Sequence, residues 1–240
     1  PRALELGGRV GQLVREAEAV LRPATLFDLK RLTRSFTLRN RDGFVENFGP
    51  VLVARARDEA PGVRLVFVPK TDRDNAQLRD GSVDLETGVI GEATRPEVLA
   101  QALFRDRFIG VVRSGHPLCK GGITAKRYAA ARHVLISRRG LDRGPIDEAL
   151  DRLCLKREVA TVVSGFAEAL ALARGSDLVA SVPERYTGAL RDGMFSFALP
   201  IAQPEHTVSL LWHPRMDADP GHRWLRGCVR DVCLAQMESD

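Results

Sequence analysis

The stretch Pro61-Gly62-Val63-Arg64-Leu65-Val66-Phe67-Val68 decides the fold class of this 240-residue chain. Pro61-Gly62 ends a helical pattern, and the six residues after it have the Val, Leu and Phe content typical of a strand. Working outward, helix and strand patterns alternate. They comprise a strand at 35–38, a helix at 40–60, a short helix at 75–79 and a strand within 83–90. This βαβαβ order favours a mostly parallel sheet covered by helices.

A second block of alternating patterns follows with no long linker. It comprises strands at 98–104, 108–112, 133–137, 159–163, 178–182, 195–199 and 207–212, and helices at 124–131, 145–153, 165–173 and 222–237. In the first block, Gly49-Pro50 interrupts the pattern at 40–60, so we expect a kink or a new first turn there. The sequence therefore predicts an α/β protein made of two blocks.

The composition is ordinary for a folded soluble protein, with 44% hydrophobic and 28% charged residues. No run of about 18 uncharged apolar residues predicts a membrane span. The net charge is +5, but residues 1–34 hold seven basic groups against four acidic ones. The rest of the chain is nearly neutral, so we expect only weak, sequence-independent binding to DNA.

The sequence shows no motif that indicates an enzyme or a metal site. Phosphate-loop, dinucleotide-binding and nucleophile-elbow glycine patterns are absent, and the five histidines lack metal-ligand spacing. The four cysteines form no C-x-x-C pair; they are Cys119, Cys154, Cys228 and Cys233. We therefore expect free thiols in a reducing, cytoplasmic compartment, and neither a metal nor a cofactor.

The first segment reads as a helix with an apolar seam of heptad spacing, ended by Pro23. The seam residues are Leu6, Val10, Leu13, Ala17 and Val20. An isolated helix of this length is marginal in water, so its seam needs a partner. The two alternatives are the chain's own body and the same helix of a second subunit, which would make a homodimer or homotetramer.

Several short motifs carry a family resemblance in their order and spacing. They are the helix at 2–22, Phe36-Thr37-Leu38 followed by a helix with Pro50, Leu78-Arg79-Asp80-Gly81-Ser82-Val83-Asp84-Leu85, His116-Pro117-Leu118, and the segment 166–183 with Leu178-Val179-Ala180-Ser181-Val182-Pro183. Together they resemble the LysR-type transcriptional regulators over essentially the whole chain, without that family's N-terminal DNA-binding domain. One departure is Glu86, a charged residue where the family usually continues with apolar ones.

The resemblance implies two Rossmann-like subdomains that resemble type 2 periplasmic binding proteins, preceded by a linker helix. The implied boundaries are 1–32 for the linker helix and connector, 33–105 plus 207–240 for subdomain I, and 106–206 for subdomain II. The implied function is that of a ligand-sensing regulatory domain, in which a small effector binds between the subdomains and controls DNA binding and transcription. DNA would be contacted only through the missing N-terminal domain.

Ligands of open α/β sheets bind beyond the C-terminal ends of the strands, beside helix N-termini. This rule selects four loops, two from each block, which would meet in one cleft. The predicted effector-binding residues are Leu38, Arg39, Asn40, Lys70, Thr71, Ser137, Arg138, Ser164, Gly165 and Phe166. The loops contribute cations and hydroxyls but no carboxylate, so the expected effector is a small organic acid. Ser164 and Thr71 serve equally as helix caps, and Phe166 equally as a core residue.

Two other functions fit the same architecture. A solute-binding protein of a transport system would need an export signal or lipid anchor. An enzyme on a two-lobed scaffold, such as a deaminase of the porphobilinogen type, would need a reactive cysteine on a cleft loop, for which Cys119 is the candidate.

Overall fold

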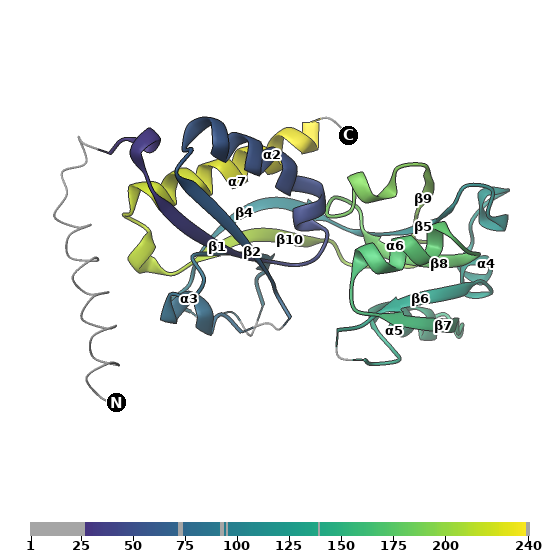
Figure 1. Ribbon diagram of the computed structural model, residues 1–240. Helices are drawn as coiled ribbons and strands as arrows, with labels where there is room; N and C mark the ends of the chain where they lie inside the picture. The colour runs from purple at the N-terminus through teal and green to yellow at the C-terminus, as the bar shows by residue number, and fades with distance from the viewer. Residues whose placement is uncertain (1–26, 72–73, 92–93, 95, 139, 239–240) are drawn as a thin grey trace, which may run out of the picture.

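The computed structural model describes residues 27–71, 74–91, 94, 96–138 and 140–238. They form two lobes, each built on a five-stranded sheet (Figure 1). The predicted linker helix and its seam, Leu6, Val10, Leu13, Ala17 and Val20, lie outside the described residues. No helix among the described residues combines the length and the apolar character needed to cross a membrane.

The first sheet has the strand order β2-β1-β3-β10-β4. Its strands are β1 (Arg34–Asn40), β2 (Val63–Pro69), β3 (Leu85–Val89), β4 (Leu99–Asp106) and β10 (His206–Trp212). β1 runs parallel to β2 and β3, whereas β10 runs antiparallel to β3 and β4. The α/β class predicted from the sequence is confirmed, but the sheet is mixed because β10 enters it from the other lobe.

Helices α2 (Phe44–Glu59) and α7 (Pro220–Glu238) lie together on one face of this sheet, and α3 (Ala76–Asp80) lies on the other side (Figure 1). α2 continues through Pro50, so the predicted new first turn there is wrong. Pro50 itself is exposed, while Phe48 and Leu52 beside it are buried in the core. Packing of this apolar face stabilises the helix despite the lost N–H donor.

The second sheet has the strand order β7-β6-β8-β5-β9. Its strands are β5 (Phe108–Arg113), β6 (Arg132–Ile136), β7 (Glu158–Val163), β8 (Leu178–Pro183) and β9 (Met194–Ala198). Helix α6 (Phe166–Arg174) packs on one apolar cluster, and α4 (Ala125–Ala129) and α5 (Pro145–Asp151) contribute to a separate one. The chain thus passes to the second sheet after Asp106 and returns to the first at His206.

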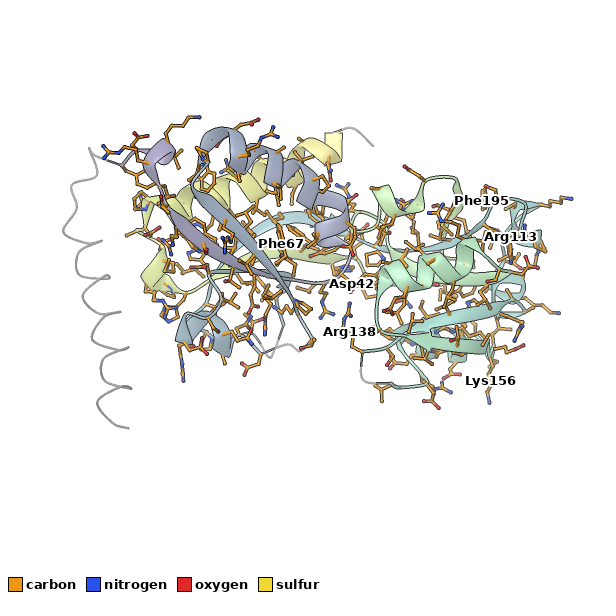
Figure 2. The ribbon with its side chains drawn as sticks, viewed as in Figure 1. Asp42, Phe67, Arg113, Arg138, Lys156 and Phe195 are labelled. Atoms are coloured by element: carbon orange, nitrogen blue, oxygen red, sulfur yellow. The ribbon has the colours of Figure 1, made fainter. Side chains whose placement is uncertain are left out.

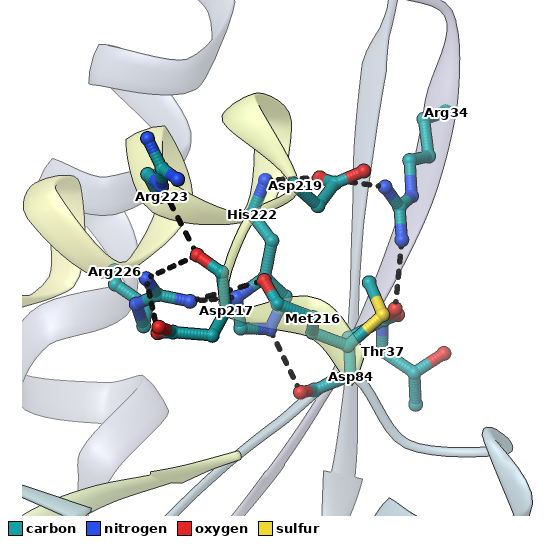
Figure 3. Close-up of polar contacts among 9 residues, drawn as sticks. All are labelled: Arg34, Thr37, Asp84, Met216, Asp217, Asp219, His222, Arg223 and Arg226. Atoms are coloured by element: carbon teal, nitrogen blue, oxygen red, sulfur yellow. Dashed lines mark hydrogen bonds and ion pairs between the residues drawn. The ribbon is translucent and has the colours of Figure 1, made fainter. Parts of the chain in front are cut away.

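Asp84, the acidic residue of the L-x-x-G-x-x-D motif, has a structural role (Figure 3). Its carboxylate accepts the backbone N–H of Thr37 at 2.8 Å and the Arg34 guanidinium at 3.2 Å. Its carbonyl accepts from His222 Nε2 of α7 at 2.9 Å. Asp219 completes the cluster by binding Arg34 and the N–H of His222, so the entry to β3 is joined to both β1 and the start of α7.

One segment after β8 packs on the first lobe although it follows a strand of the second. Tyr186 is buried in the first core, with its ring centroid 5.8 Å from that of Phe104 and 6.4 Å from that of Phe48. The Asn47 side chain donates to the Arg185 carbonyl at 2.9 Å and accepts from the Ala189 N–H at 2.9 Å. The boundary drawn from the sequence at 106–206 therefore places in subdomain II a segment that the structure packs on subdomain I.

Burial of His133 should make stability fall in acid. The side chain is fully buried beside Tyr128, and its pKa is lowered to about 4, first by desolvation and then by the charge of Arg157. In the unfolded chain the group titrates near its ordinary value of about 6.5, so the unfolded state binds the proton first as pH falls. The stabilisation is complete above about pH 6.5 and is lost as pH falls toward about 4.

This shift predicts that His133 alone removes about 3 kcal/mol from the free energy of unfolding between pH 7 and pH 4. Urea unfolding at several pH values, compared with the non-titrating variant His133→Gln, measures the effect. The variant is expected to be less stable at pH 7 but to give a flatter curve. Parallel curves for the two proteins would contradict the prediction.

Candidate functional site: the cleft between the subdomains

The C-terminal ends of β1, β2 and β3 carry a buried cluster of charges. Arg39 and Lys70 are 3% and 6% exposed, and both pair with Glu86, which is fully buried. The Glu86 oxygens lie 2.9 Å from Arg39 Nε and 2.5 Å from Lys70 Nζ. The expectation that the cleft loops lack a counter-carboxylate is therefore wrong for subdomain I.

Asparagine side chains complete this cluster. Asn75 donates to Glu86 at 2.7 Å, and Asn40 accepts from the Thr87 hydroxyl at 2.8 Å. Desolvation is the largest influence on Lys70 and lowers its pKa, while the Glu86 carboxylate acts in the opposite direction. Arg39 also donates to the Gln77 amide oxygen at 3.0 Å, so its guanidinium is held rigidly by the surrounding side chains.

A second carboxylate joins the two subdomains. Asp42 lies in the turn between β1 and α2, and its two oxygens accept from the Arg138 guanidinium and from the backbone N–H of Phe166. Arg138 follows β6 and Phe166 begins α6, so both donors belong to the second subdomain. Figure 2 shows Asp42 and Arg138 facing each other between the lobes. Arg138 also lies over the Phe166 ring, 5.4 Å from its centroid.

Glu168 is a third carboxylate at this place. It reaches back over the start of α6 and accepts from the N–H groups of Ser164 and Gly165 at 3.0 Å and 3.1 Å. The Ser164 hydroxyl also donates to it. These bonds lower the pKa of Glu168, with the hydroxyl of Ser164 as the first cause. Ser164 thus belongs to the capping arrangement that was one of its two expected roles.

The remaining predicted residues are distributed unevenly around this site. Leu38 is 1% exposed and part of the first core, so its side chain packs and does not face the cleft. Ser137 accepts the N–H of Leu141 and stabilises its own loop. Thr71 is exposed at the end of β2, and Gly165 and Phe166 are buried at the start of α6.

Asp42, Glu86, Asn75 and Glu168 are site residues that sequence reasoning missed. Glu86 had one signal, since it was the charged residue at a position where the resembled family is apolar. Asp42 had none beyond its place next to a selected loop, because its partners are about 100 residues away in the chain. Among the described residues, no group of three or more His, Cys, Asp or Glu side chains is arranged to hold a metal ion.

Cys119, the candidate nucleophile of the enzyme alternative, lies in a short 3-10 helix after β5. Its thiol contacts the Arg113 carbonyl at 3.8 Å, and the bonds described above do not connect it to the cleft charges. The described cysteines are free, with Cys228 and Cys233 buried in the first core. Burial raises the pKa of both thiols to about 12.

The architecture and the cleft agree with what comparison with known proteins finds. Residues 34–234 match the family model described as the LysR substrate binding domain. This chain belongs to the LysR family. The HTH-type transcriptional activator NagR of Ralstonia sp is 28% identical over 94% of this chain and 76% of its own length.

Solved structures show the same relationship. The probable transcriptional regulator PA0477 from Pseudomonas aeruginosa is 28% identical, with a TM-score of 0.73 over 96% of this chain and 78% of that one. The regulatory domain of MexT, a transcriptional activator in Pseudomonas aeruginosa, is 26% identical, with a TM-score of 0.70 over 84% of this chain and 98% of that one. The prediction of a ligand-sensing regulatory domain of a LysR-type regulator is confirmed.

Proposed function

We propose that the effector of this LysR domain is a small organic acid whose carboxylate binds in the cleft between the subdomains. The observation that supports this is the manner in which the cleft holds the carboxylate of Asp42, between the guanidinium of Arg138 and a backbone N–H at the start of α6. A guanidinium and a helix N-terminus are the donors that carboxylates prefer.

The charge of the cleft supports the same class of ligand. Four cations, Arg39, Arg41, Lys70 and Arg138, face three carboxylates, Asp42, Glu86 and Glu168. Pairing with Glu86 leaves the Arg39 and Lys70 side of the cleft with a net positive charge. An added anion reduces this excess, whereas an added cation increases it.

Binding would act by changing the equilibrium between arrangements of the two subdomains, with no chemical step at the site. The change would reach DNA through a separate N-terminal domain, as the HTH-type names of the relatives indicate. The apolar seam predicted at residues 6–20 supports pairing of two such chains, as a homodimer or as part of a homotetramer. The free cysteines support a cytoplasmic location.

A screen of small carboxylic acids by thermal shift, followed by calorimetry of the best hit, tests the effector class. Arg138→Ala should weaken that hit by about 30-fold, because a charge-assisted bond in a partly desolvated cleft is lost. Arg132→Ala is the matched control, because Arg132 starts the same strand β6 and forms an exposed pair with Glu158. Equal losses from both variants, or a best hit that is neutral or cationic, would contradict the proposal.

A further inference from the structure

The turn between β1 and α2 places a carboxylate of the chain itself against the second subdomain. Both oxygens of Asp42 are used, Oδ1 by Arg138 and Oδ2 by the N–H of Phe166. The side chains of Asp42 and Arg138 are only 26% and 21% exposed. This contact differs from the other interlobe contacts, which are made by the segment around Tyr186 and by backbone groups near Asp106.

The backbone around the contact leaves room for this carboxylate and for little else. A Cβ added to Gly165 would lie 2.9 Å from Asp42 Oδ2. On the other side, Gly43 has φ +90, and a Cβ added there would lie 2.7 Å from the Tyr186 carbonyl oxygen. Glycine is the residue that tolerates both the left-handed backbone and the close approach. The two glycines let the turn bring Asp42 close to α6.

Subdomain II would offer the same donors to an effector. Arg138 is held over the Phe166 ring, and the Phe166 N–H points out of the first turn of α6. A second carboxylate cannot occupy the position of Asp42 Oδ1 and Oδ2 while Asp42 is there. Displacing Asp42 would free the donors and also break the contact between the subdomains.

We infer that Asp42 is a built-in competitor of the effector, which bridges the subdomains through Arg138 and the start of α6 until an effector carboxylate replaces it. The inference rests on the proposed function and adds its regulation. It predicts that the unliganded protein holds this edge of the cleft closed. It also predicts that affinity for a carboxylate is lower than the cleft could provide, because each binding event must first break the Asp42 contact.

Asp42→Asn tests this inference in the full chain, because the amide keeps the shape but presents an N–H donor or a neutral oxygen to Arg138. We expect amide hydrogen exchange of residues 164–170 to become several-fold faster without ligand. We also expect acetate and benzoate, used as probes, to bind about tenfold more tightly than to the original protein, the factor that one charged hydrogen bond contributes. Exchange is measured by mass spectrometry and binding by calorimetry.

Asp177→Asn is the matched control, because Asp177 also pairs with an arginine, Arg113 at 2.6 Å, but within subdomain II alone. It should change neither readout. Unchanged exchange, together with equal probe affinity in the Asp42 variant and the original protein, would overturn the inference while leaving an anionic effector in place. Faster exchange with no binding of either probe to any of the proteins would overturn both the competition and the proposed effector class.

Discussion

Replacing Glu86 with alanine is expected to lower the free energy of unfolding by about 3–5 kcal/mol, because it leaves two buried cations without their shared carboxylate. Arg39 keeps its bond to Gln77, but Lys70 loses the carboxylate that offsets its desolvation. The expected response is a proton lost from Lys70, water entering the cluster, or both. Urea denaturation followed by circular dichroism measures the change.

Glu158→Ala is the control for this substitution. Glu158 pairs with Arg132 in an exposed geometry, and such pairs contribute about 0–1 kcal/mol. Glu86→Gln keeps the side-chain shape and should fall between the two, so a soluble variant is available if Glu86→Ala does not accumulate. A loss of less than about 1 kcal/mol for Glu86→Ala, equal to that of the control, would mean that the cluster is hydrated in solution.

Tyr186→Ala is expected to cost about 3–5 kcal/mol, since it removes a buried aromatic ring from the first core. The ring packs among Phe44, Phe48 and Phe104, with centroids 5.8–6.4 Å away. It also attaches the segment after β8 to the first lobe, so the variant should loosen the contact between the lobes. Burial raises the pKa of the Tyr186 hydroxyl, consistent with a dry site.

Tyr186→Phe keeps the ring and should cost less than about 1 kcal/mol, as volume-conserving substitutions do. Denaturation measured by two probes separates the effects, with near-ultraviolet dichroism reporting the aromatic core and far-ultraviolet dichroism reporting the helices. Similar large losses for both variants would mean that the hydroxyl, and not the ring, stabilises this junction.

The sequence by itself determined the α/β class and most of the elements. Hydrophobic period is a local property, so the strand at Val63–Pro69 and the helix at Phe166–Arg174 appear close to their predicted places. The same holds for the chain's passage between lobes, since β4 and β5 are separated by a single residue, Arg107. Four of the residues selected by the strand-end rule, Arg39, Lys70, Arg138 and Phe166, lie in the two charged clusters of the cleft.

Only the tertiary structure decided which charges meet. Glu86 pairs with Lys70 across 16 positions of the chain, and Asp42 reaches Phe166 across 124 positions. No periodicity reports such distances, because they depend on how the two lobes approach each other and not on local propensity. The antiparallel entry of β10 and the docking of Tyr186 on the first core have the same origin. A cation on a selected loop is therefore visible in the sequence, whereas the carboxylate that neutralises it is a property of the fold.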